Sequence, residues 1–411
     1  MKAVILAAGY GKRMGGDTPK PLVELYGLPL IEHKIRKLDG YEIIVVYHDE
    51  RIKDHIQKRF PRIKLVYNPY PERENGYSLY CVKDLIKEGE SFILLMADHY
   101  YDEGFYRDIN PINQTTVYVS AKCYQEDEAT KVKVQGDKVI KIGKGIDDYD
   151  YFDTGFFVCS YESLVYAERA VSQREKVKLS DIMQLLADDG RLSYKVMDEF
   201  WIDIDTKEDL KKAEEFIRRS LIKPTDGIIS KFLNRKISTR ITPFLLRYDF
   251  ITPNRITVFV SLLGFLTSVL FYFKYYLLAG IMTQIVSIID GCDGEVARIK
   301  NLSSRFGAVL DSVLDRYVDI FIISAIFLSI EKDIFLSLSF IPALTGSVLV
   351  SYVSHLSGWR PYLATRDIRL FLVMVFSILF SLYENMIYAF FAVIAVITHV
   401  SVIFTLLRLR S

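Results

Sequence analysis

The distribution of charged and apolar residues divides the chain into two parts. Up to about Ile222 charged side chains recur continually, whereas from Ile256 onward long apolar stretches dominate and charges are confined to the segments between them. At 411 residues, 50% of them hydrophobic and 25% charged, the chain is long enough for two or three domains. The pattern predicts a soluble domain over residues 1–222, a linker over 223–250 and a membrane domain over 251–411.

The membrane part contains six apolar segments that are long enough to cross a bilayer when their ends extend into the flanking turns. They are Ile256–Phe273, Tyr275–Asp290, Gly307–Ile330, Ile334–Leu356, Leu370–Tyr383 and Met386–Leu406. An even number of spans places both ends of the domain on the same side. The predicted fold of this part is therefore all-α, with six transmembrane helices.

Basic residues lie mostly on one side of these six segments. The opposite loops contain only Lys274 and Lys332, whereas the loops after the second and fourth segments and the C-terminal tail contain Arg298, Lys300, Arg305, Arg360, Arg366, Arg369, Arg408 and Arg410. Because cytoplasmic loops are enriched in Lys and Arg, we expect the N-terminal domain, the C-terminus and both sites described below to be cytoplasmic.

The segment Asp226–Arg247, between the two parts, mixes large apolar residues with basic ones. The basic residues are Lys231, Arg235, Lys236, Arg240 and Arg247. This composition just before a first span predicts an amphipathic helix on an anionic membrane surface, and an ordinary linker helix is the alternative.

In the first part, short apolar or β-branched runs alternate with helical patterns. Strands are predicted at Lys2–Leu6, Glu42–Tyr47, Lys64–Tyr67 and Ser91–Ala97, with helices such as Pro29–Leu38 and Arg51–Arg59 between them. The alternation predicts a Rossmann-like α/β domain with a mostly parallel sheet covered by helices. A phosphate ligand would bind at the carboxyl ends of such strands.

Net charge and cysteines exclude several classes of function. A formal net charge of +1 gives no argument for nucleic-acid binding. The four cysteines, Cys81, Cys123, Cys159 and Cys292, are far apart in sequence, so neither a disulfide framework nor a structural zinc site is indicated. The N-terminal run Met1–Gly9 is too short in its apolar core for a signal peptide and reads as a first strand.

Four aspartates occupy the ends of two neighbouring apolar segments. Asp290 and Asp293 are three residues apart and Asp311 and Asp315 are four apart, so each pair projects from one face of a helix. Four clustered carboxylates repel one another unless cations neutralise them, which indicates one or two Mg²⁺ or Mn²⁺ ions. Charges of an interfacial loop would explain one or two of these aspartates, but not two paired arrangements.

Small residues and one arginine accompany the aspartates. Gly291, Gly294, Ala297 and Gly307 leave the helix surfaces bare for a flat ligand. Arg298 can bind a phosphate bidentately.

At these residues the chain resembles the CDP-alcohol phosphotransferase family. The family signature, Asp-x-x-Asp-Gly-x-x-Ala-Arg, eight residues, Gly, three residues, Asp, three residues, Asp, is present at every position from Asp290 to Asp315. Thr252–Thr257 is similar to the Pro-Asn-x-x-Thr motif that begins the family's first membrane helix. The resemblance implies that Asp315 is the general base and also touches a metal. It further implies that Asp290, Asp293 and Asp311 bind the metal. Gly294, Ala297 and Arg298 would contact the CDP-alcohol. Asp319, one turn further along, lies outside the signature and is expected to tune the site or pair with Arg316.

The loop after the first predicted strand carries the chemistry of the soluble part. Its sequence, Leu6-Ala7-Ala8-Gly9-Tyr10-Gly11-Lys12-Arg13-Met14, offers glycines that let backbone N–H groups approach a polyphosphate, followed by two cations. Met14 excludes a dinucleotide fingerprint, and Asp17 excludes a Walker A loop.

Together with Pro19-Lys20-Pro21-Leu22, this loop resembles the signature of nucleoside-triphosphate sugar nucleotidyltransferases. Glu74–Leu79 looks like the pyrimidine-contacting loop of phosphocholine-type cytidylyltransferases. The resemblance implies that Arg13 and Lys20 hold the triphosphate in a loop formed by Leu6, Ala7, Ala8, Gly9 and Gly11. It also implies that Asp98, Asp203 and Asp205 bind Mg²⁺ and that Asn75 and Ser78 contact the base. Lys131 and Lys178 would then bind the phosphate of the acceptor.

Structural explanations compete with several of these assignments. A helix N-cap is the alternative for Asp98, and a turn is the alternative for Asp203 and Asp205. Lys131 is as readily an exposed strand lysine, and His99 is interpreted as loop packing rather than as a metal ligand.

The two halves fit one reaction sequence, because a nucleotidyltransferase makes the activated alcohol that a CDP-alcohol enzyme consumes. The fusion resembles the family that combines inositol-1-phosphate cytidylyltransferase with di-myo-inositol-phosphate-phosphate synthase. This resemblance implies formation of CDP-inositol and pyrophosphate from CTP and inositol-1-phosphate. Phospho-inositol then passes to a second inositol-1-phosphate with release of CMP, in a homodimer. A phospholipid synthase is the alternative enzyme, and a membrane half that serves only as an anchor or transporter is the alternative from another class.

A phosphorylated acceptor requires cations near the aspartates. The candidates are Arg360, Arg366, Arg369, Arg408 and Arg410, each of which also suits a positive-inside anchor. Both roles stay open for Arg360, and the anchor role is favoured for the others.

Overall fold

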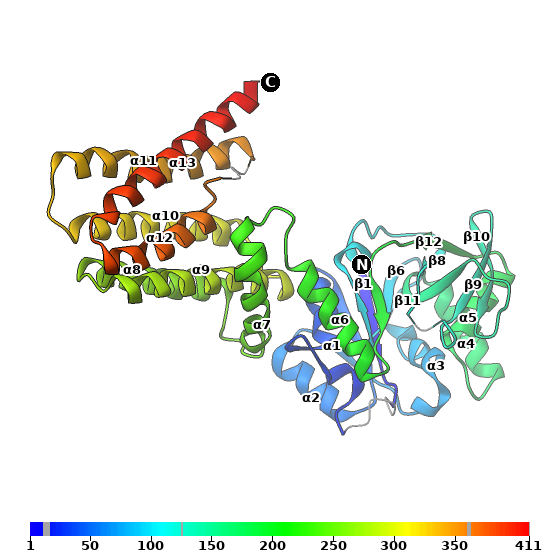
Figure 1. The fold of residues 1–411 in the computed structure, drawn as a ribbon. Helices are drawn as coiled ribbons and strands as arrows, with labels where there is room; N and C mark the ends of the chain where they lie inside the picture. Colours follow the sequence, from blue (N-terminus) through cyan, green and yellow to red (C-terminus); the bar gives the residue numbers. More distant parts are fainter. Residues whose placement is uncertain (11–16, 125, 360–362, 411) are drawn as a thin grey trace. The chain divides into compact units, whose positions relative to one another are not determined.

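The computed structural model describes residues 1–10, 17–124, 126–359 and 363–410, which form two compact units, Met1–Phe216 and Ile217–Ser411 (Figure 1). The first unit is built on a nine-stranded sheet with the strand order β5-β4-β1-β6-β11-β8-β12-β10-β9. The strands are β1 (Lys2–Ala7), β4 (Glu42–Tyr47), β5 (Lys64–Tyr67), β6 (Ser91–Met96), β8 (Thr115–Ser120), β9 (Lys131–Gln135), β10 (Lys138–Gly143), β11 (Tyr151–Ser160) and β12 (Leu192–Val196).

The four strands predicted from the sequence are confirmed to within one residue, and they pair in parallel as β5-β4-β1-β6. The expectation of a mostly parallel sheet is wrong for the other half, where β11 is antiparallel to β6 and β8, and β10 is antiparallel to β9 and β12. For β9 and β10 the reason is local, because they form a hairpin through Gly136, at a φ of +62°, instead of being joined by a helical crossover.

Helices cover both faces of this sheet. They are α1 (Leu30–Lys37), α2 (Glu50–Arg59), α3 (Asn75–Tyr80), α4 (Glu162–Gln173) and α5 (Leu179–Asp188), followed by α6 (Lys207–Ser220). Alternate residues of β1 enter two separate cores: Val4 and Leu6 pack with residues of α3, α4 and α5, whereas Ala3 and Ile5 pack with residues of α1 and α2. A strand buried on both faces explains why the first apolar run is continuous.

A two-stranded sheet lies beside the large one and positions the functional residues. It pairs β7 (His99–Tyr101) antiparallel with β13 (Trp201–Asp203), so that Asp203 lies opposite His99. Since β7 begins three residues after β6 ends at Met96, this pairing brings the acidic motif near residue 203 to the carboxyl end of β6.

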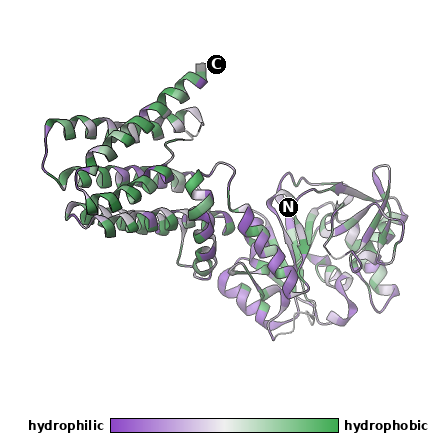
Figure 2. Ribbon diagram, viewed as in Figure 1, coloured by the Kyte–Doolittle hydropathy of each residue, from purple (hydrophilic) through white to green (hydrophobic). Residues whose placement is uncertain are grey.

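The second unit is helical. After α7 (Arg235–Leu246) come α8 (Pro253–Tyr272), α9 (Tyr276–Ile299), α10 (Arg305–Leu328), α11 (Ile334–Ser357), α12 (Arg366–Leu382) and α13 (Met386–Arg410). Apolar residues cover these last six helices (Figure 2). Helix α8 packs on α9 and α10, α9 packs on α12, and α11 packs on α13. Gly280 lets α9 approach α12 closely, because a Cβ there would lie 2.5 Å from the Cβ of Ser377.

Among the described helices, four are long and apolar enough to cross a membrane: Pro253–Tyr272, Tyr276–Ile299, Ile334–Ser357 and Met386–Leu409. The sequence predicted six. The other two predicted spans are α10 and α12. Helix α10 contains three aspartates and Arg316, which make it less apolar, and α12 is short, with 17 residues.

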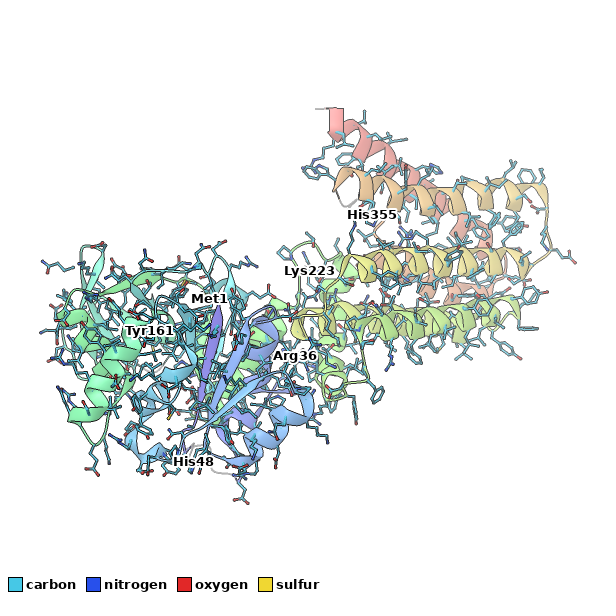
Figure 3. The ribbon with its side chains drawn as sticks, turned by 180° about the vertical axis from the view of Figure 1, so that it is seen from behind. Met1, Arg36, His48, Tyr161, Lys223 and His355 are labelled. Carbon is cyan, nitrogen blue, oxygen red and sulfur yellow. The ribbon has the colours of Figure 1, made fainter. Side chains whose placement is uncertain are left out.

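An ion-pair network between α1 and α2 stabilises the first unit. The carboxylate of Glu32, which is fully buried, lies 2.9 Å from nitrogen atoms of Arg36, His55 and Arg59 (Figure 3 labels Arg36). Burial alone would raise the pKa of Glu32, but the hydrogen bond from His55 and the charges of the two arginines outweigh it and hold that pKa below 4.5. The carboxylate is therefore ionised at neutral pH.

We expect Glu32→Gln to destabilise the first unit by about 3 kcal/mol at pH 7, because two largely buried arginines lose their counter-charge. Since the folded-state pKa is depressed, this stabilisation is present above pH 4.5 and disappears as the pH falls through the folded-state value. The difference from wild type should thus shrink below pH 4.5. Pulse proteolysis of the full chain in urea measures it, and equal stability at pH 7 would contradict the prediction.

Candidate active sites

The first site lies at the carboxyl end of β6. Asp98 follows that strand in a turn, and ligand atoms of Asp98, His99 and Asp203 all lie within 4.8 Å of one another. Asp98 precedes a strand and not a helix, so the N-cap alternative is wrong. The carboxylate oxygens of Asp98 and Asp203 suit a hard divalent cation, and Asp205, the third ligand suggested by the sequence, contacts the same cluster through Lys20.

Lys20 is drawn into this acidic cluster. Its Nζ lies 2.8 Å from Asp98 Oδ2, 3.1 Å from Asp203 Oδ1 and 2.8 Å from Asp205 Oδ1, and its side chain is only 7% exposed. Burial would lower the pKa of Lys20, but the three carboxylates outweigh it and raise that pKa above its ordinary value. The residue assigned to the triphosphate is therefore a charged partner of the residues assigned to the metal.

His99, which sequence reasoning set aside as loop packing, belongs to the same cluster. Its Nδ1 donates to the Thr154 carbonyl at 2.8 Å, and its Nε2 lies 3.6 Å from Asp203 Oδ2 and 3.8 Å from Asp98 Oδ1. Burial would lower the pKa of His99, but Asp203 and then Asp98 raise it to about 9. Gly155 makes room for this ring, since a Cβ there would lie 2.7 Å from His99 Cε1.

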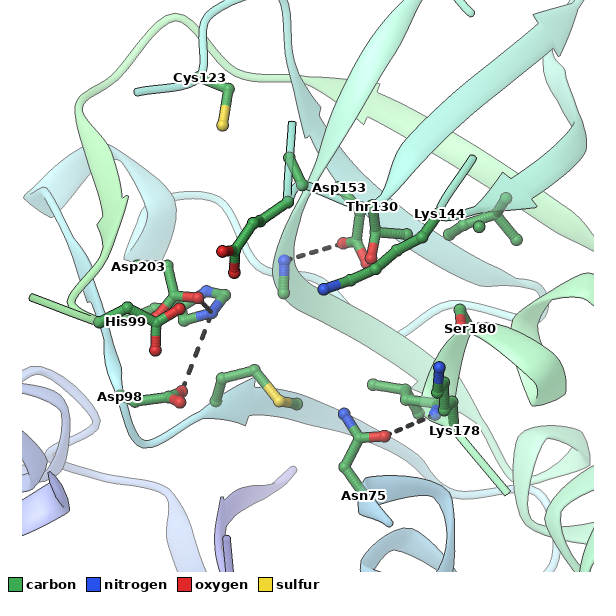
Figure 4. A pocket seen from close by; sticks show the side chains of 18 of the residues that line it. Asn75, Asp98, His99, Cys123, Thr130, Lys144, Asp153, Lys178, Ser180 and Asp203 are labelled. Carbon is green, nitrogen blue, oxygen red and sulfur yellow. Dashed lines mark hydrogen bonds and ion pairs between the residues drawn. The ribbon is translucent and has the colours of Figure 1, made fainter. Parts of the chain in front are cut away.

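A cavity of about 650 Å³ opens from the acidic cluster (Figure 4). Lys144 and Lys178 line it, together with Thr130 and Asp153. Burial raises the pKa of Asp153 to about 6, although the Gly155 N–H donates to its carboxylate. Sequence reasoning missed Lys144, although its place just after β10 was a usable signal.

Lys131 is not among the described residues that line this cavity; its Nζ lies instead 4.7 Å from the ring centroid of Tyr149. That contact agrees with the alternative of a strand lysine.

The predicted nucleotide loop is only partly described. Leu6, Ala7 and Ala8 are buried, Gly9 is exposed, and Gly11 and Arg13 lie outside the described residues.

The predicted base contacts are also engaged within the protein. Asn75 lines the cavity, and its Oδ1 accepts from the Leu179 N–H at 2.7 Å. Ser78 is buried and accepts from Asn68 Nδ2 at 2.9 Å. Their contact with a base stays a prediction.

The second site lies where α9 meets α10. Carboxylate oxygens of Asp290, Asp311 and Asp315 lie within 4.8 Å of one another, as the signature spacing predicted. Asp293 is held by α8 instead, because its Oδ2 accepts from Thr257 Oγ1 at 2.6 Å. Thr257 is the last residue of the Pro-Asn-x-x-Thr motif, so this motif positions a signature aspartate.

The carboxylates of the second site fit a divalent cation. In the part of the chain that the structure describes, Asp311 Oδ1 is buried and has no hydrogen-bond partner. A buried carboxylate oxygen without a donor, beside two further carboxylates, is an oxygen ligand set of the kind that Mg²⁺ or Mn²⁺ takes. Gly294 and Arg298 follow the two aspartates of α9, and a Cβ at Gly294 would be 3.3 Å from Arg298 Nη1, while Arg298 Nη2 donates to the Leu221 carbonyl at 3.2 Å. Ala297 is on the same helix.

Two arginines of α12 complete this site. Arg366 Nη1 lies 2.8 Å from both Asp290 Oδ2 and Asp315 Oδ1, and Arg369 Nη2 lies 2.6 Å from Asp319 Oδ2. The anchor role favoured from the sequence is therefore wrong for both, because Arg366 is paired with three carboxylates and the buried Arg369 is paired with Asp319.

The remaining candidates differ in how far the structure describes them. The guanidinium carbon of Arg408 lies 3.7 Å from the ring centroid of Trp359. Arg360 lies outside the described residues. Asp319 reaches Arg316 only at 3.9 Å, so its main partner is Arg369.

Two family models match the chain. Residues 3–119 match the MobA-like NTP transferase domain, and residues 250–407 match CDP-alcohol phosphatidyltransferase. Each match coincides with one of the two carboxylate clusters or with the strands that lead to it.

Curated proteins are similar over almost the whole chain. A protein of Aquifex aeolicus named bifunctional IPC transferase and DIPP synthase is 37% identical over 98% of this chain and 97% of its own length. A protein of the same name from Archaeoglobus fulgidus is 35% identical over 99% of this chain and 84% of its own length. The solved structure of the inositol-1-phosphate CTP transferase from T. maritima is 25% identical and covers 52% of this chain and 96% of its own, with a TM-score of 0.47. The chain belongs to the family of bifunctional IPC transferases and DIPP synthases, with a nucleotidyltransferase-fold N-terminal domain and a helical CDP-alcohol phosphotransferase domain.

Proposed function

We propose that the chain makes CDP-inositol in its first unit and consumes it in its second. CTP and inositol-1-phosphate give CDP-inositol and pyrophosphate, and phospho-inositol then passes to a second inositol-1-phosphate with release of CMP. The product is a precursor of the osmolyte di-myo-inositol phosphate. One observation carries the proposal: a single chain holds two carboxylate clusters, each with a cationic side chain drawn into it, in the two domains that such a sequence requires.

In the first unit, Asp98, Asp203 and Asp205 would hold Mg²⁺, which offsets the charge that grows on the phosphoryl oxygens when bound. Lys20, which contacts the same three aspartates, stays charged and would bind the triphosphate. Arg13 would add a second cation. Lys178 and Lys144 would bind the phosphate of inositol-1-phosphate, which attacks the α-phosphate of CTP.

The hydroxyl groups of inositol need polar partners in the same cavity. Asp153 and Thr130 offer an acceptor and a hydroxyl there (Figure 4). A cyclic polyol phosphate therefore fits both the charge and the polarity of this cavity.

In the second unit, Asp290, Asp293 and Asp311 would hold the divalent metal and Asp315 would take the proton from the acceptor hydroxyl. Arg366, 2.8 Å from Asp315, places a positive charge where the phosphate of the acceptor arrives next to that hydroxyl. Gly294, Ala297 and Arg298 would contact the CDP-alcohol. Arg360 and Arg408 remain candidates for the same acceptor phosphate.

The membrane arrangement is part of the proposal. We take residues 1–222 as a cytoplasmic domain, 223–250 as a linker and 251–411 as six membrane-spanning helices, α8 to α13. Helices α10 and α12 can cross the bilayer because Asp315, Asp319, Arg366 and Arg369 pair with one another inside the bundle, where buried charges are tolerated. Both sites then face the cytoplasm, and the chain associates as a homodimer through its membrane helices.

Two reciprocal variants test the division of labour. Asp315→Asn should slow CMP release from CDP-inositol by about 10²- to 10⁴-fold, because it removes the base, while pyrophosphate release from CTP stays at the wild-type rate. Lys20→Met should slow pyrophosphate release from CTP and leave CMP release from CDP-inositol at the wild-type rate. Both rates are measured on the same purified full-length protein. Wild-type CMP release by the Asp315→Asn protein would exclude the proposed membrane reaction.

Lys144 and Lys131 form a matched pair for the phosphate-binding assignment. Lys144→Met should raise the KM for inositol-1-phosphate by about 10- to 100-fold, the effect of losing one charge-assisted hydrogen bond, with the KM for CTP little changed. Lys131→Met, which removes the same charge from a strand next to the cavity, should change neither constant. Steady-state kinetics of pyrophosphate release decide it, and a larger effect at Lys131 would reverse the assignment.

A further inference from the structure

We propose that the segment Gly227–Leu246, just before the first membrane span, is a positioning element of the membrane site, and that it acts through Glu295 on α9 and Asp367 on α12. The inference rests on the proposed function of the membrane unit, because it gives a role in that site to residues outside its metal and substrate contacts. The segment comprises the π-helical stretch Ser230–Asn234 and helix α7, which follows it directly.

Glu295 is the first of the two contact points. It occupies a variable position of the signature and is fully buried. Its Oε1 lies 2.8 Å from Arg235 Nη1 and accepts from Ser238 Oγ at 2.6 Å, and its Oε2 accepts from Thr242 Oγ1 at 2.5 Å. All three partners belong to α7, where spacings of three and four residues place them on one face of the helix. Because a buried carboxylate is costly unless it is paired and hydrogen-bonded, these contacts fix α7 against α9.

Arg235 links this contact directly to the aspartates. Besides Glu295, its Nη1 donates to the Gly291 carbonyl at 2.9 Å, and its Nε lies 3.0 Å from Asp226 Oδ2. Gly291 stands between the two signature aspartates of α9, and a Cβ there would lie 2.6 Å from the same Nη1. Arg235 therefore holds the backbone that carries Asp290, and does not belong to the basic membrane-facing side expected from the sequence.

The second contact point is on α12. Asp367 Oδ2 accepts from the Ser230 N–H at 2.8 Å, and Gly227 lies so close that a Cβ would collide with the same carboxylate. Asp367 directly follows Arg366, whose guanidinium joins Asp290 to Asp315. The segment is thus bonded both to the helix that carries Asp290 and to the first turn of the helix that carries Arg366.

These two attachments set the distance between α9 and α12 at the site. Metal and phosphate geometry tolerates displacements of only about 0.5 Å, and changes in residues that orient ligands typically cost about 10- to 100-fold in affinity or activity. A second buried link, in which Asn234 donates to Ser287 Oγ at 3.0 Å and accepts from Gln284 at 2.6 Å, continues the attachment along α9.

The test uses full-length protein in detergent and compares three variants. Glu295→Gln should lower kcat for CMP release by about 10- to 100-fold and raise the Mg²⁺ concentration needed for half-maximal rate, with the KM for CDP-inositol little changed. Thr242→Val removes one of the three hydrogen bonds and keeps the ion pair, so it should shift both quantities in the same direction by a smaller factor. Arg240→Gln is the matched control, because it removes a basic side chain from the exposed face of the same helix.

Two further measurements separate positioning from a loss of folding. Pyrophosphate release from CTP by the same molecules should stay at the wild-type rate in all three variants. Cys292, buried between the aspartates with its Sγ 3.8 Å from the Ser238 carbonyl, should be alkylated faster in Glu295→Gln than in wild type or Arg240→Gln.

The inference is overturned if Glu295→Gln and Thr242→Val keep the wild-type kcat and Mg²⁺ dependence, even if their thermal stability falls. It is also overturned if Arg240→Gln shows the same loss, since charge at the membrane surface would then be the cause. If wild-type protein releases no CMP from CDP-inositol, the proposed function fails, and the alkylation of Cys292 then decides the positioning inference alone.

Discussion

Both halves of this protein must keep several carboxylates within a few ångströms of one another. At an effective dielectric constant of about 20, two like unit charges 4 Å apart repel by roughly 4 kcal/mol, so such a cluster is stable only with a cation inside it. Lys20 meets this requirement in the first unit and Arg366 in the second, each at 2.8 Å from two carboxylates. A divalent metal would bind to the same carboxylate oxygens, and the phosphates of a substrate would bind to the same lysine and arginine.

The two folds reach this arrangement by different routes. In the first unit the strands bring the carboxylates together. Asp98 lies two residues after the end of β6, and the pairing of β7 with β13 places Asp203 opposite His99. In the second unit helix periodicity and helix ends do it, because Asp311 and Asp315 are one turn apart and Arg366 is the first residue of α12. The carboxylate cluster is therefore the shared feature, and it is built by strand pairing in the first unit and by helix periodicity and helix packing in the second.

The sequence predicted most of the features that depend on short motifs of fixed spacing or on continuous apolar runs. The four parallel strands lie where the apolar runs indicated, and three of the four signature aspartates and the pair Asp98 and Asp203 come together as their motifs indicated. It did not predict what depends on pairing between distant segments. Asp203 and Asp98 raise the pKa of His99, Lys144 reaches the cavity from the end of β10, and Glu295 meets α7 from near the C-terminal end of α9. Arg366 and Arg369 were interpreted as membrane anchors because a basic loop residue and a buried ion-pair residue look alike in sequence.

The central claim is that one chain carries out both steps on soluble substrates. Phosphorus NMR of purified full-length protein with CTP, Mg²⁺ and inositol-1-phosphate, without added lipid substrate, tests it most directly. The account predicts pyrophosphate and CDP-inositol first, followed by CMP and a phosphodiester that contains two inositol units. Accumulation of CDP-inositol, with CMP appearing only after a lipid alcohol is added, would contradict it and identify a phospholipid synthase instead.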